Sequence, residues 1–127
     1  MSPRRAYVTG AGVISPAGRG VDATLQTLSA GRRCLTPLTL FPPSSKGALP
    51  AGQVLDGLEL EGDLPRTHAL ALVAAREAMA GREGQAVEAV VMGGTTGGMP
   101  RTEELLRDGV DDPGPYALHG VGTVAGR

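Results

Sequence analysis

The chain has 127 residues, the length of one domain, and its 12 Lys and Arg residues nearly balance its 13 Asp and Glu residues. A net charge of -1 argues against nucleic-acid-binding arms and polybasic membrane patches, which require clustered positive charge. The single cysteine, Cys34, excludes an intramolecular disulfide and a cysteine-based metal cluster. Because neither a signal peptide nor an apolar run of transmembrane length is recognisable, we expect a cytoplasmic protein without nucleic-acid or membrane partners.

The composition predicts a thin hydrophobic core. Aromatic side chains supply large blocks of buried area, and this chain has only two Tyr and one Phe. Its 20 glycines add to the backbone entropy that is lost on folding. We therefore expect the chain to be part of something larger.

The first elements in chain order are a strand, a loop and a helix. Residues 5–9 form a short run that predicts a strand, and glycines crowd the loop at 10–20. Apolar residues at helical spacing between Val21 and Leu28 predict a helix, which Gly31 is expected to end in a left-handed conformation.

The middle of the chain is irregular and leads into the clearest predicted helix. Prolines interrupt residues 32–65, where 51–55 predicts a short strand. Residues 67–80 are rich in alanine and predict a helix closed by Gly81. Because apolar groups occur on most sides of this helix, we expect it to be buried.

The last part of the chain predicts a strand, a turn and a helix. The valine-rich run at 87–92 predicts an interior strand, and a glycine-rich turn follows at 93–98. Pro100 marks the start of a helix, with Glu103 and Glu104 expected in its first turn, where acidic groups suit the helix dipole.

Residues 116–127 have helix-like character but contain no stop signal. We therefore expect this element to continue in a longer protein, of which residues 1–127 are a truncated portion.

Two glycine clusters invite a nucleotide-binding interpretation. Gly10 and Gly12 follow the first predicted strand, but Ser15 stands where the dinucleotide fingerprint has its third glycine, and residues 28–38 lack an acidic ribose partner. The glycines at 93–98 have phosphate-loop spacing without the Lys and Ser or Thr that such a loop needs. For 93–98 we prefer a tight strand-to-helix turn. A small nucleotide-binding domain is the least favoured hypothesis for the whole chain.

No residue of the chain is assigned a catalytic, cofactor-binding or metal-binding role. Cys34 follows two arginines, but nothing nearby in the sequence offers the base that a catalytic thiol needs. His68 and His119 belong to no ligand-spaced cluster, and we interpret both as structural or surface residues.

The order of the segments resembles the opening of β-ketoacyl-acyl-carrier-protein synthases. The run T-G-A-G-V-I-S-P-A-G at 9–18 is similar to the first loop of that family, and G-G-T-T-G-G at 93–98 is similar to its G-S-G-x-G-G turn. The other similar segments are L-S-A-G-R at 28–32, Phe41, A-G-Q-V at 51–54 and the alanine-rich helix at 66–79. The resemblance covers nearly the whole chain but only the first part of the family's catalytic unit.

This resemblance implies a thiolase-like α/β fold, of which the chain holds an incomplete N-terminal portion. The complete family has layered α-β-α-β-α architecture, forms homodimers and uses no metal or redox cofactor. It condenses an acyl thioester with a malonyl-acyl-carrier-protein, with loss of carbon dioxide, in fatty-acid or polyketide biosynthesis. The implied partners are acyl carrier protein and acyl thioesters.

The family's cysteine nucleophile and its two histidines (or His and Asn) correspond to positions beyond Arg127, so the chain alone is expected to be an inactive acyltransferase fragment. By position, Met99 and Thr102 are candidates for the acyl pocket or the dimer interface. The loop before Tyr116 is short, and Gly122 stands where many members carry Asn. Acyl specificity therefore stays open. The second hypothesis is a non-catalytic subunit of the chain-length-factor type, which pairs with a ketosynthase as a heterodimer.

Overall fold

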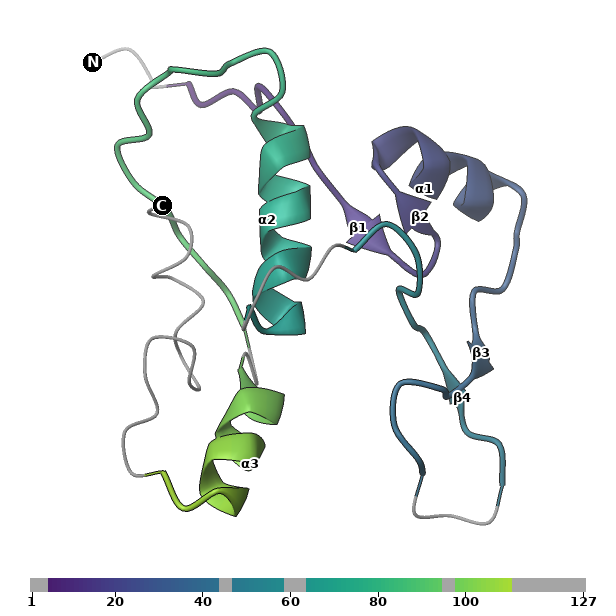
Figure 1. The fold of residues 1–127 in the computed structure, drawn as a ribbon. Coiled ribbons are helices and arrows are strands. Elements are labelled where there is room, and N and C mark those ends of the chain that lie inside the picture. The colour runs from purple at the N-terminus through teal and green to yellow at the C-terminus, as the bar shows by residue number, and fades with distance from the viewer. Residues whose placement is uncertain (1–4, 44–46, 59–63, 95–97, 111–127) are drawn as a thin grey trace. The chain divides into compact units, whose positions relative to one another are not determined.

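A computed structural model describes residues 5–43, 47–58, 64–94 and 98–110 of the chain (Figure 1). The elements in these ranges are β1 (Ile14–Ser15), β2 (Gly18–Arg19), α1 (Val21–Ser29), β3 (Thr36–Pro37), β4 (Pro50–Ala51), α2 (Arg66–Ala78) and α3 (Met99–Arg107). The chain divides into two compact units, Met1–Val54 with Ala74–Glu83, and Leu55–Val73 with Gly84–Arg127. Among the described residues, no helix combines the length and apolar character needed to cross a membrane.

In the first unit, the predicted glycine-rich loop contains a small hairpin. Strands β1 and β2 pair antiparallel, with Ile14 opposite Arg19. The Gly20 N–H donates to the Val13 carbonyl at 2.8 Å and so closes the hairpin at its base. Gly20 has φ 92°, a conformation that favours glycine and turns the chain directly into α1.

Helix α1 confirms the predicted helix and its terminator. Gly31 follows the helix with φ 63°, in the left-handed region. Its N–H donates to the Leu28 carbonyl at 3.0 Å, and the Arg32 N–H donates to the Thr27 carbonyl at 3.2 Å. These two bonds form a Schellman motif, which satisfies carbonyls that the end of a helix leaves without partners.

The strand predicted at 51–55 is wrong in extent, because only Pro50 and Ala51 are in β4, which pairs antiparallel with β3. The chain leaves the ladder at Gly52, and Gln53 then hydrogen-bonds to the β3 segment through its side chain instead of its backbone. A side-chain amide thus replaces the strand pairing that the sequence pattern predicted.

Helix α2 lies close to its predicted position, and Gly81 follows it with φ 76°. The expectation that this helix is buried is wrong for most of its length. His68 and Ala69 are buried, at 0% and 2% exposure, while its other residues are half-buried or exposed. Burial requires neighbouring elements on several sides, and the described part of the chain surrounds α2 fully only at His68 and Ala69.

The strands predicted at 5–9 and 87–92 are not formed in the described structure. Val8 is 91% exposed and Val91 is 95% exposed, so the apolar side chains that indicated strands are in solvent. A strand needs a hydrogen-bonded neighbour, and the described residues provide none for these two segments. The thiolase-like sheet therefore stays a prediction.

In the second unit, α3 begins at Met99 with Gly98 as its N-cap, and Pro100 lies in its first turn as predicted. Glu103 and Glu104 lie beyond that turn, so their expected position next to the helix N-terminus is wrong by about one turn. The reason is that Gly98, with φ 78°, starts the helix before the proline. The predictions for residues 111–127, which include Tyr116, His119 and Gly122, fall outside the described residues.

Candidate functional site

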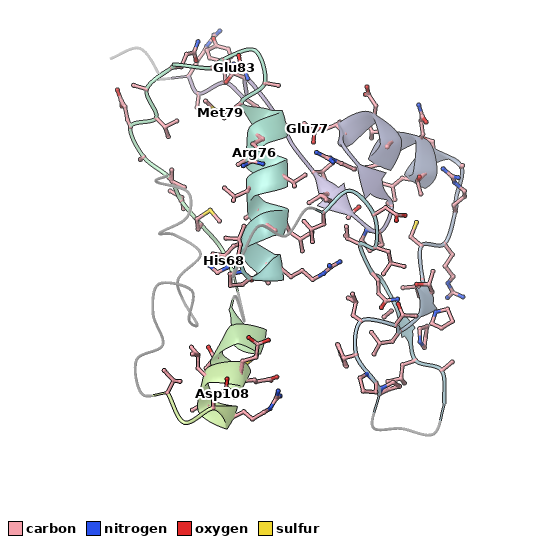
Figure 2. All side chains as sticks on the ribbon, viewed as in Figure 1. His68, Arg76, Glu77, Met79, Glu83 and Asp108 are labelled. Atoms are coloured by element: carbon pink, nitrogen blue, oxygen red, sulfur yellow. The ribbon has the colours of Figure 1, made fainter. Side chains whose placement is uncertain are left out.

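The best-defined polar site in the first unit is built around the carboxylate of Glu77, on the C-terminal half of α2 (Figure 2). Its Oε2 accepts the Val13 N–H at 2.8 Å, and its Oε1 accepts the Val21 N–H at 2.8 Å. Val13 precedes β1 and Val21 is the first residue of α1. One side chain therefore fixes both ends of the β1–β2 hairpin.

The site has the electrostatics of an anion held by backbone dipoles. The hydrogen bonds from Val13 and then Val21 lower the pKa of Glu77 below its ordinary value of 4.5; desolvation by burial opposes this effect, and the charge of Arg19 makes the smallest contribution to the lowering. The N-cap of α1 is Gly20, which has no side chain to cap the helix. Glu77, which lies on α2, instead caps the N-terminus of α1, where the helix dipole favours negative charge.

Gly10 and Gly12 are required by the close approach of this loop to α2. A Cβ at Gly12 would collide with the carbonyl oxygen of Ala74 and would lie 2.8 Å from the backbone nitrogen of Ala78. A Cβ at Gly10 would collide with the carbonyl oxygen of Ala78. Neither glycine has a positive φ, so the contact with helix backbone, not the loop conformation, excludes a side chain here.

This geometry argues against the nucleotide-binding hypothesis. In a dinucleotide fold the glycines let the backbone approach a pyrophosphate at the helix N-terminus. Here Gly10 and Gly12 face the backbone of α2, and the Val21 N–H at the start of α1 already binds a carboxylate. A phosphate at the same position would meet the negative charge of Glu77.

The two residues predicted from the resemblance, Met99 and Thr102, lie together at the start of α3 in the second unit. Met99 is 37% exposed, and the Thr102 hydroxyl donates to the Gly98 carbonyl at 3.3 Å. The Gly98 N–H in turn donates to the Thr67 hydroxyl at 3.2 Å, which ties the start of α3 to the start of α2. Their role in an acyl pocket or dimer interface stays a prediction.

The nucleophile and histidine candidates do not assemble into a catalytic group within the described residues. His68 is buried, with its Nδ1 3.4 Å from the Thr67 hydroxyl, which agrees with its interpretation as a structural histidine. Cys34 is half-buried, and its thiol donates only to the Arg32 carbonyl at 3.6 Å. Within the described ranges, no three His, Cys, Asp or Glu residues gather where they would hold a metal ion.

Sequence reasoning missed two polar residues that organise the structure. No role is predicted for Glu77 from the sequence, although a glycine N-cap at the start of α1 is a signal that the cap must come from elsewhere. Gln53, which is buried, accepts the backbone N–H groups of Thr39 and Leu40 and donates to the Pro37 carbonyl at 2.8 Å. Nothing in the local sequence indicates that role.

Comparison with known proteins finds one informative similarity. No protein-family model matches the chain, and no solved structure matches it. The chain is 37% identical over 113 residues to "Putative polyketide beta-ketoacyl synthase 1" of Streptomyces cyaneus. The match covers 79% of this chain but 27% of that protein, so the chain spans about a quarter of the length of this curated relative. The similarity supports a distant relationship with ketosynthases.

Proposed function

We propose that this chain forms the N-terminal portion of a β-ketoacyl synthase-type protein of polyketide or fatty-acid biosynthesis. The observation that carries the proposal is the 37% identity over 113 residues to a protein with a polyketide ketosynthase name. It agrees with the order of segments that resembles this family, from the glycine loop at 9–18 to the glycine turn at 93–98.

In the proposed reaction, a cysteine thiolate outside this chain takes an acyl group from a thioester and releases the thiol of that donor. A malonyl group on an acyl carrier protein then loses carbon dioxide, and the resulting carbanion attacks the acyl-enzyme carbonyl carbon, which forms a new carbon–carbon bond and releases the cysteine thiolate. The present chain supplies no nucleophile or base to these steps. Its proposed contribution is structural: it provides the loop held by Glu77 and the start of α3. The resemblance to the family leads us to expect Met99 and Thr102 in an acyl pocket or a dimer interface.

Sequencing of the coding DNA through and beyond the codon for Arg127 tests the proposal directly. We expect the reading frame to continue to a cysteine flanked by small residues and then to two histidine motifs. A continued ketosynthase-like frame in which another residue replaces the cysteine identifies the chain-length-factor type of subunit, paired with a separate ketosynthase. A continued frame without ketosynthase-like sequence overturns the proposal.

Acyl transfer to the purified 127-residue chain is the complementary experiment. We expect no covalent label from a fluorescent acyl thioester, because the hydrogen bond that the structure gives the Cys34 thiol goes to the Arg32 carbonyl and not to a base that could activate it. The Cys34→Ser variant is the matched control. Labelling of the wild type that this substitution abolishes would assign chemistry to Cys34 and contradict the scaffold role.

The nucleotide-binding alternative is tested by adding NAD or ATP during thermal unfolding. We expect no change of the melting temperature, because a carboxylate occupies the helix N-terminus where a phosphate would bind. A concentration-dependent increase would restore that alternative.

A further inference from the structure

The two ends of residues 13–21 are bound by the same ionisable group on α2. The loop and the helix start are separated from Glu77 by 64 and 56 positions in the sequence, yet both donate a backbone N–H to it. The hairpin closes around this carboxylate, because the Gly20 N–H donates to the Val13 carbonyl at 2.8 Å. Gly20 also leaves room for it, since even a Cβ there would come within 3.1 Å of the Glu77 Oε1.

Two charged side chains belong to the elements that Glu77 binds. Strand β2 contributes Arg19, whose charge favours the ionised form of Glu77. Helix α1 contributes Asp22 in its first turn, and that residue is exposed. Residues 10–18 contain no acidic or basic side chain. The protonation state of Glu77 itself therefore decides whether both backbone N–H groups find an anionic acceptor.

We propose that Glu77 is a protonation-sensitive latch that holds residues 13–21 on the C-terminal half of α2 when ionised and releases them when protonated. A carboxylate accepts at both oxygens, whereas a carboxylic acid carries a proton on one of them and presents a donor to one of the two N–H groups. Protonation thus weakens both bonds, and most strongly the bond to the oxygen that carries the proton, because bonds to a charged acceptor are the stronger ones. This inference does not depend on the proposed function.

The direction of the pH dependence follows from the depressed pKa of Glu77. Because the folded-state pKa lies below 4.5, the latch is closed at neutral pH and remains closed as the pH falls to that value. It opens only as the pH falls further, through the folded-state pKa.

Amide hydrogen exchange of the 127-residue chain tests the latch. With rates corrected for the intrinsic effect of pH, we expect the Val13 and Val21 amides at pH 7 to exchange about tenfold more slowly in the wild type than in Glu77→Gln. We expect this difference to disappear at a pH below the Glu77 pKa. Equal rates in the two proteins at pH 7 would overturn the proposal.

Glu83→Gln is the matched control. Glu83 also has a lowered pKa, through hydrogen bonds from its own backbone N–H and then from Gly81, but none of these bonds reaches residues 13–21. This substitution should leave the Val13 and Val21 amides unchanged. An equal effect of Glu83→Gln would mean that loss of charge, not the latch, controls exchange.

A measurement on the wild type covers the case in which Glu77→Gln does not fold. The carboxyl carbon resonance of Glu77 and the amide resonances of Val13 and Val21 should titrate with one common midpoint below 4.5. Amide resonances that do not follow the Glu77 titration would overturn the proposal without any variant.

Discussion

Substitution of Gly12 by alanine probes the contact between the glycine loop and α2. The new Cβ would collide with the Ala74 carbonyl oxygen, and it would lie 2.8 Å from the backbone nitrogen of Ala78 and 2.9 Å from the carbonyl carbon of Ala74. All of these atoms belong to helix backbone, which does not rotate away as a side chain does. The loop must therefore move outward, and the adjacent Val13 N–H is then drawn away from Glu77.

The expected cost follows from the nature of this clash. Overpacking of a well-packed contact destabilises by about 1–3 kcal/mol, and a clash with helix backbone belongs at the upper end of that range. We expect Gly12→Ala to lower the free energy of unfolding by about 2–3 kcal/mol, a large part of the stability of a small domain. Because Gly12 does not have a positive φ, none of this cost arises from backbone strain.

Urea denaturation followed by far-ultraviolet circular dichroism measures this effect, with Gly47→Ala as the matched control. A Cβ at Gly47 would meet nothing within 4 Å, and its φ is not positive, so this variant should stay within about 0.5 kcal/mol of the wild type. Gly12→Ala should unfold at a lower urea concentration than Gly47→Ala, while the slope of the unfolding free energy against urea concentration stays the same. Equal midpoints for Gly12→Ala and Gly47→Ala would refute the close packing of the loop on α2.

Three further predictions concern other parts of the structure. Gln53→Ala should lower the free energy of unfolding by about 2–3 kcal/mol and speed amide exchange at Thr39, because the buried Gln53 amide makes several part-buried hydrogen bonds that alanine cannot make; unchanged exchange would contradict the role of Gln53. Val8→Lys combined with Val91→Lys should reduce self-association in sedimentation velocity, since both side chains are exposed in segments without strand partners; an unchanged oligomer distribution would contradict this. The folded-state pKa of Glu77 is depressed, so its contribution to stability is fully present above pH 4.5 and is lost as the pH falls through the folded-state pKa. On acidification, the urea midpoint should therefore decline more steeply in the wild type than in Glu77→Gln; parallel declines would contradict this contribution.

The resemblance to ketosynthases and the measured similarity rest on the same linear pattern, so the family relationship was accessible without a structure. The thiolase-like sheet cannot be derived from this linear pattern alone. Strands at 5–9 and 87–92 depend on hydrogen-bonded neighbours, and such neighbours come from positions distant in sequence. Periodicity and valine content report a preference for strand but not the presence of a partner.

Local sequence signals determined the helices. Apolar spacing from Val21 and the glycines at 31 and 81 predicted where α1 and α2 lie and how they end, because a left-handed residue and its capping bonds involve only the last turn of a helix. Tertiary structure decided what Gly10 and Gly12 are for. The motif departs from the dinucleotide fingerprint, but it does not show what the two glycines contact. The structure shows that contact: the backbone of α2, more than sixty positions away, next to the Glu77 carboxylate that binds the Val13 and Val21 amides.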